Sequence, residues 1–132
     1  MFSVDLNTRE ADSHVVVSLR GELDVADAAS VAAALAAAAT GGLEIIVDLA
    51  GLDFIDSSGV AALAHGRTHA RHAGGDLVLA APQQQVLRIL TLTRLIEVFS
   101  VHASVDDAGG GGSSSRQPAL PVAGSPVLLA AT

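Results

Sequence analysis

Apolar and polar residues alternate in two short, β-branched runs at the start of the chain. The runs cover residues 2–7 and 14–20, and the polar stretch 8–13 between them is typical of a turn. The pattern predicts an N-terminal β-hairpin.

The spacing of apolar residues then changes to three and four, which predicts a helix that begins after Asp24 and ends at Gly41 and Gly42. Asp24 has the side chain of a helix N-cap. A compact β-branched run at 44–49 follows, as expected for a buried central strand. Further on, the pattern predicts a helix from Ser57 to Gly74, a strand over 76–80, a helix from Pro82 to Leu92 and a last strand over 97–103.

Strands that alternate with helices in this way imply right-handed crossovers and a mostly parallel sheet, here with one antiparallel hairpin. The predicted class is α/β, in a domain over residues 1–105. From residue 106 to 132 the chain is rich in Gly, Ser and Pro, a composition typical of a flexible tail. Its apolar end, 120–132, is compatible with a loosely docked strand, but its Pro and Gly residues exclude a membrane helix.

Composition narrows the function classes. The chain has no Cys, a formal net charge of -7 and only three aromatic residues, so disulfide chemistry is excluded and nucleic acid is a poor partner. No apolar stretch approaches the ~20 residues of a membrane span, and the start lacks a basic leader, so we expect a cytoplasmic protein with no membrane partner. Seven acids and no Lys or Arg lie from Gly21 to Asp56. Such a surface suits a basic partner, or simply keeps the chain in solution.

The segment Asp56-Ser57-Ser58-Gly59 carries the candidate chemistry. We expect Gly51 to end the preceding strand, Phe54 and Ile55 to anchor the chain in the core, and Asp56 to open a helix. Unpaired amides and the positive end of the helix dipole favour capping oxygens or an anion there. Two interpretations stand: a plain helix cap with Gly59 allowing close packing, or a serine that is switched by phosphorylation.

Three motifs in order carry a resemblance to a known family: Gly-Glu-Leu-Asp at 21–24, Asp-Phe-Ile-Asp-Ser-Ser-Gly at 53–59, and Gly-Gly-Asp-Leu-Val at 74–78. Over about residues 2–104 the chain resembles the STAS domain of bacterial anti-sigma factor antagonists. The resemblance implies a sheet of four or five strands with helices. One departure is Thr93-Arg94-Leu95, where the family commonly has a Gly after its third helix.

The resemblance also implies a function, called partner switching. In that family a cognate anti-sigma factor, itself a serine-protein kinase, phosphorylates the serine that corresponds to Ser57, and a PP2C-type phosphatase reverses the reaction. The unphosphorylated form captures the anti-sigma factor and frees a sigma factor for transcription. The residues expected at the partner-binding site are Asp24, Asp56, Ser57, Ser58 and Gly59, with Asp24 close to Ser57.

Other chemistries have weaker support. His65, His69 and His72 share one helical face, but no Cys or carboxylate on that helix completes a metal site, so we expect them to be solvated. The chain lacks a Gly-x-Ser-x-Gly elbow and a phosphate-binding loop motif, so we expect neither an enzyme nor a cofactor. The alternative function is a STAS module that binds a small ligand or nucleotide, or that acts as a constitutive scaffold in a complex.

Overall fold

The computed structural model describes residues 2–9 and 14–108 and confirms the α/β class. A five-stranded sheet has the order β1-β2-β3-β4-β5; β1 and β2 are antiparallel, and every other pair is parallel. In chain order the elements are β1 (Ser3–Arg9), β2 (His14–Leu23), α1 (Val25–Ala39), β3 (Glu44–Ile55), α2 (Ser57–His72), β4 (Leu77–Ala80), α3 (Gln84–Leu92), the 3-10 helix η2 (Leu95–Glu97), β5 (Val101–His102) and α4 (Val105–Ala108).

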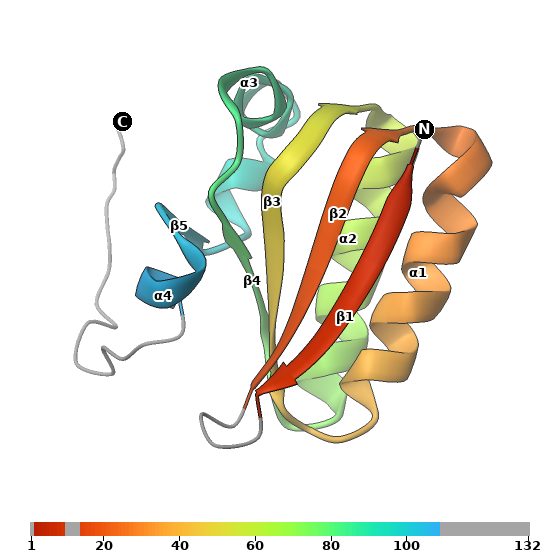
Figure 1. Ribbon diagram of the computed structural model, residues 1–132, viewed down its shortest axis with the longest axis vertical. Helices are drawn as coiled ribbons and strands as arrows, with labels where there is room; N and C mark the ends of the chain where they lie inside the picture. Colours follow the sequence, from red (N-terminus) through yellow and green to blue (C-terminus); the bar gives the residue numbers. More distant parts are fainter. Residues whose placement is uncertain (1, 10–13, 109–132) are drawn as a thin grey trace.

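The main core lies between the sheet and the pair α1 and α2, which lie side by side behind it (Figure 1). This core is aliphatic, as the composition predicts, except for Phe99, and its fully buried members include Leu19, Leu35, Leu63 and Leu77. The two helices pack closely because Gly66 of α2 faces Leu35 of α1. A β-carbon at position 66 would lie 2.6 Å from the Leu35 Cδ1 atom.

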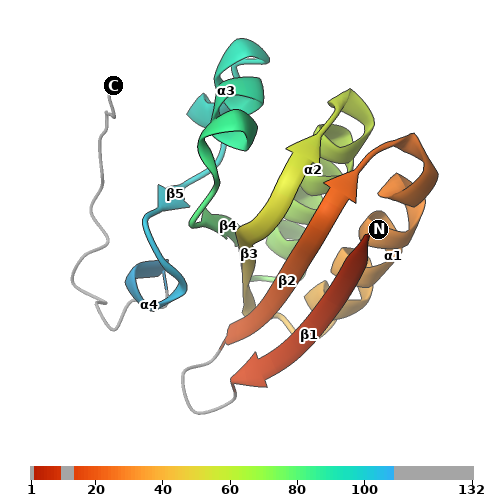
Figure 2. The same cartoon turned by 45° about the horizontal axis from the view of Figure 1, so that its top comes forward.

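A smaller cluster covers part of the other face of the sheet. It is formed by Val16, Ile46, Val78 and Ala80 of the strands together with Ala108 of α4. Figure 2 shows α4 beside β5, on the side of the sheet away from α1 and α2. No helix in the described part of the chain has the length and apolar character needed to cross a membrane.

The structure corrects parts of the sequence prediction. β3 runs on to Ile55, so Gly51 lies within the strand and does not end it. The last strand contains only Val101–His102, because residues 95–97 form the 3-10 helix η2. α3 begins at Gln84 and not at Pro82.

Near both ends of the chain the observed elements also differ from the predicted ones, and parts of two predicted segments lie outside the described residues. In the hairpin, residues 8 and 9 belong to β1, and residues 10–13 lie outside the described part. The helix α4 was not predicted. Of the predicted tail, 109–132 lies outside the described residues, including the apolar segment 120–132.

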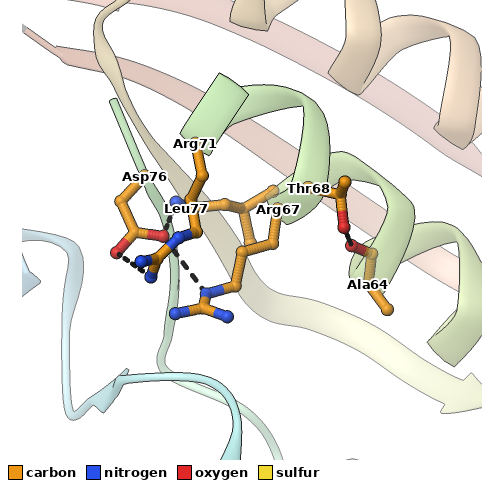
Figure 3. Close-up of polar contacts among 6 residues, drawn as sticks. All are labelled: Ala64, Arg67, Thr68, Arg71, Asp76 and Leu77. Atoms are coloured by element: carbon orange, nitrogen blue, oxygen red, sulfur yellow. Dashed lines mark hydrogen bonds and ion pairs between the residues drawn. The ribbon is translucent and has the colours of Figure 1, made fainter. Parts of the chain in front are cut away.

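The C-terminal half of α2 is tied to the start of β4 through Asp76 (Figure 3). Arg67 Nε lies 3.2 Å from Asp76 Oδ1, and Arg71 Nη1 lies 3.8 Å from Asp76 Oδ2. The backbone N–H of Leu77 also donates to Asp76 Oδ1, at 2.8 Å. These side chains are partly exposed, so the ion pairs position the helix more than they stabilise the fold.

Candidate functional site

The candidate site lies where β2 and β3 end beside each other. Leu23 and Ile55 are register partners at the ends of these parallel strands, and the backbone N–H of Asp56 donates to the carbonyl oxygen of Leu23 at 3.1 Å. Each strand leads directly into a helix, so Asp24 and Asp56 follow neighbouring residues. The structure thus brings the predicted site residues of α1 and α2 together at one edge of the sheet.

Asp24 caps α1, as predicted. Its backbone is extended, and its Oδ1 accepts a hydrogen bond from the backbone N–H of Ala26 at 3.0 Å. The carboxylate is half-buried. A carboxylate at a helix N-terminus satisfies an otherwise unpaired amide and interacts favourably with the helix dipole, which explains its place at the start of an alanine-rich helix.

Asp56 caps α2 in the same way and with two bonds. Its Oδ1 accepts from the backbone N–H groups of Ser58 and Gly59, at 2.9 and 3.1 Å. The amides expected to attract an anion are therefore already satisfied by a carboxylate. An anion arriving here meets the negative charge of Asp56 before it meets those amides.

Ser57 is the first residue of α2, and its side chain is exposed. Within residues 2–9 and 14–108 no group hydrogen-bonds its hydroxyl. Ser58 is half-buried, and Gly59 is buried against Leu23 and Ile55. The arrangement presents one hydroxyl to an external protein.

The charge around Ser57 is negative. Asp24, Asp53 and Asp56 lie on the segments that meet here, and no Lys or Arg occurs from position 21 to 56. A phosphate on Ser57 would add about -1.5 to -2 charges to this group of carboxylates.

Two apolar side chains at this edge, Val25 and Phe54, are exposed. For Phe54 the prediction of a core position was wrong. Phe54 was expected to anchor the chain in the core, yet it is 45% exposed, and Val25 is 73% exposed. For Phe54 the cause is an irregularity in β3: Asp53 has no register partner on β2, which interrupts the alternation of the strand. Ile55 is buried, as predicted. Val25 follows Asp24 and Phe54 follows Asp53, so this edge exposes apolar area beside carboxylates.

The three histidines of α2 lie apart from this edge. His65, His69 and His72 are all exposed, as predicted. No group of three or more His, Asp or Glu residues in the described part of the chain is placed to hold a metal ion. The histidines add no ligand set to the site around Ser57.

The chain is similar to anti-sigma factor antagonists. A model of the STAS domain matches residues 5–108. The anti-sigma-F factor antagonist RsfA of Mycobacterium tuberculosis is 34% identical over 100 residues, which are 74% of this chain and 78% of that protein. The crystal structure of an anti-sigma factor antagonist from Mycobacterium paratuberculosis has a TM-score of 0.73 and 25% identity, covering 82% of this chain and 91% of that chain. SpoIIAA, a Bacillus cell fate determinant solved in its phosphorylated form, has a TM-score of 0.60 and 25% identity over 82% of this chain and 96% of that chain.

Proposed function

Because this chain belongs to the STAS domain family, we propose that it is an anti-sigma factor antagonist whose binding is switched at Ser57. The observation that carries the proposal is the exposed hydroxyl of Ser57 in the first turn of α2, a helix that Asp56 caps and that begins beside the start of α1, which Asp24 caps. The name of the relative RsfA, an anti-sigma-F factor antagonist, supports an anti-sigma factor as the partner.

In the unphosphorylated state the chain binds the anti-sigma factor through the edge formed by the ends of β2 and β3. Asp24, Asp56, Ser57 and Ser58 supply the polar contacts, while Val25 and Phe54 supply exposed apolar area. Gly59 contributes indirectly, because its lack of a side chain lets α2 approach the sheet. Capture of the anti-sigma factor frees the sigma factor for transcription.

Phosphorylation of Ser57 ends this binding. The phosphate joins a surface that is already negative, and the amides of Ser58 and Gly59 are occupied by Asp56. A docked partner would have to bury the added charge without help from these amides of α2, which is unfavourable. A loss of ~3 kcal/mol, roughly a hundredfold in affinity, is enough for a switch.

The other parts of the proposal follow from this role. The kinase is the anti-sigma factor itself, and a PP2C-type phosphatase restores the binding form. The chain acts in the cytoplasm as a binding protein and catalyses no reaction.

The test uses the full chain and the anti-sigma factor that co-purifies with it from the native cell. We expect Ser57→Ala to bind that protein as the wild type does, and Ser57→Asp to bind about a hundredfold more weakly. Ser58→Asp is the matched control for an added charge next to the site, and it should weaken binding less. Equal affinities of the Ser57→Ala and Ser57→Asp variants would contradict the switch and favour a constitutive scaffold.

A further inference from the structure

β3 contains two β-bulges shortly before Ser57. In its pairing with β2, Ser18 pairs with Asp48 and Arg20 with Gly51, so Leu49 and Ala50 oppose a single residue. A second shift leaves Asp53 without a register partner on β2. Bulged residues are not fixed by the regular ladder, and they change the direction of the strand.

The other edge of β3 also lacks a strand at this point. The pairing with β4 ends at Asp48 and Ala80, because β4 turns away into the segment that leads to α3. From Ala50 onwards the carbonyl groups on this edge therefore have no strand partner. Such groups need other donors to be satisfied.

Two glutamines at the start of α3 supply these donors. Gln83 Nε2 donates to the carbonyl oxygen of Ala50 at 2.8 Å and to Asp53 Oδ1 at 3.3 Å. Gln85 Nε2 donates to the carbonyl oxygen of Asp53 at 3.2 Å and to Gln83 Oε1 at 2.9 Å. We call Gln83 and Gln85 the glutamine clamp. The clamp bonds both bulged places of β3 and joins its two members to each other.

The clamped segment leads directly into the site. Asp53 is followed by the exposed Phe54, by Ile55 and Asp56, and then by Ser57 at the start of α2. Figures 1 and 2 show α3 next to the end of β3 from which α2 begins. The orientation of Phe54 therefore depends on the bulge at Asp53, which the clamp holds.

We propose that Gln83 and Gln85 are positioning residues, which hold the bulged end of β3 so that Phe54 and Ser57 are presented to the anti-sigma factor in one orientation. This inference rests on the proposed function. The clamp acts only through Asp53 and the backbone of β3. It makes α3 part of the recognition apparatus even where α3 makes no contact with the partner.

The test replaces the donor nitrogen and keeps the shape of the side chain. In Gln83→Glu and Gln85→Glu an oxygen stands where Nε2 donated, so the bonds to the two carbonyls are lost and repulsion takes their place. We expect the amides of residues 53–58 to exchange with solvent about tenfold faster, while the amides of α1 keep their rates. Affinity for the co-purified anti-sigma factor should fall about tenfold.

Gln84→Glu is the matched control. Gln84 lies between the two clamp residues and is exposed, and no group in the described part of the chain hydrogen-bonds its side chain. The control adds the same charge at the same helix start, so any effect of charge on the helix or on the partner is measured separately. A rescue variant combines Gln83→Glu with Asp53→Asn, which restores a donor and an acceptor in exchanged places and should recover part of the lost affinity.

The exchange and affinity measurements can contradict the proposal in two ways. Unchanged exchange at residues 53–58 in both clamp variants would overturn the proposal, because the clamp would then hold nothing. Faster exchange with unchanged affinity would also overturn it, since the bonds would be structural only. If the wild type binds no anti-sigma factor, the proposed function fails, whereas the exchange measurement still decides whether the glutamines fix the segment.

Discussion

The backbone of Gly59 packs so closely on Leu23 that a β-carbon at position 59 would lie 2.7 Å from the Leu23 Cγ atom. Ile55 Cγ1 would be equally close, at 2.7 Å. Neither atom is the free end of a flexible side chain, so neither can move aside easily. The first turn of α2, with Ser57 on it, therefore rests directly on the ends of β2 and β3.

Gly59→Ala should destabilise the domain even though Ala is the better helix former. The helix propensity gain is about 1 kcal/mol, while forcing a methyl into packed atoms costs about 1–3 kcal/mol. We expect a net loss of about 1 kcal/mol in the free energy of unfolding, measured by urea titration. Adding Leu23→Ala makes room for the methyl, so the double variant should lose less than the sum of the two single losses. Strict additivity would contradict the contact.

Substitutions at Asp56 distinguish the contribution of its cap hydrogen bonds to stability from that of its negative charge. Asp56→Ala removes the acceptor for two amides and should cost about 1 kcal/mol of stability. Asp56→Asn keeps an acceptor oxygen, and it should stay within about 0.5 kcal/mol of the wild type. Urea midpoints of the two variants compare them directly. If the Asn variant loses as much as the Ala variant, the cap hydrogen bonds are not what stabilises the helix start.

Val25 tests whether the exposed apolar residues bind the partner. Its side chain is 73% exposed, so Val25→Ser should change stability by less than about 0.5 kcal/mol. Affinity for the anti-sigma factor should fall about tenfold, as expected when an apolar contact is lost from an interface core. Leu92→Ser, at a residue of α3 that is 71% exposed, is the control and should bind normally. Equal losses in both variants would argue against a defined docking edge.

Arg94 occupies a backbone conformation that suits glycine. Its φ of 65° and ψ of 10° are left-handed, so the turn after α3 has this shape although the chain lacks the Gly that the family commonly has there. Arg94→Gly should raise the free energy of unfolding by roughly 0.5–1 kcal/mol, since the strain exceeds the value of the exposed ion pair with Glu97.

The same substitution in the middle of α3 provides the control for Arg94. Arg88→Gly should lower stability by about 1 kcal/mol, because glycine is a poor residue for a helix interior. Opposite signs for the two variants in urea titrations are the expected result. A loss of stability in both would show that the left-handed turn carries no strain.

His102 makes stability depend on pH. Burial lowers the pKa of His102 from its ordinary value of 6.5, and the nearby carboxylate of Asp107 opposes part of this shift. Between the folded and unfolded pKa values the unfolded chain binds more protons, so this contribution is complete above pH 6.5 and is lost as the pH falls through the folded value.

His102→Gln should therefore flatten the loss of stability with acid, by at most about 1.4 kcal/mol per pH unit. Urea midpoints at a series of pH values below about 7 measure the slope. Asp107→Asn should have the opposite effect, because the pKa of His102 falls further without that carboxylate. A slope that is the same in wild type and His102→Gln would rule out this origin.

Much of the fold could be predicted from the sequence because long apolar patterns dominate it. The spacing that runs from Val25 to Ala39 and the β-branched run at 45–47 gave the right elements, and Asp24 was rightly predicted as a cap. The prediction was weaker for the short elements near the end of the domain. The last strand was predicted over 97–103 but has two residues, and α4, with four residues, is too short for a periodic pattern and was missed.

The site was only partly predictable, for a different reason. The position of Ser57 at a helix start follows from local residues alone, so the sequence sufficed. The exposure of Phe54 depends on a β-bulge in the pairing of β3 with β2. The bulge cannot be recognised from the order of apolar and polar residues along the chain. The glutamine clamp is likewise a contact between distant segments, and three successive glutamines give no sign of which two will bond.

The ion pair between Arg67 and Asp76, which positions α2, also has a consequence for how fast the proposed switch can act. Asp56 caps the first turn of α2 and Asp76 pairs with Arg71 in its last turn, so both ends of the helix already have partners before any phosphate is added. Under the proposed function, the change of partner would be timed by the addition and removal of the phosphate on Ser57. Each binding state of the domain would then last until the kinase or the phosphatase acts on Ser57, and its lifetime would not depend on a slow conformational change of the domain.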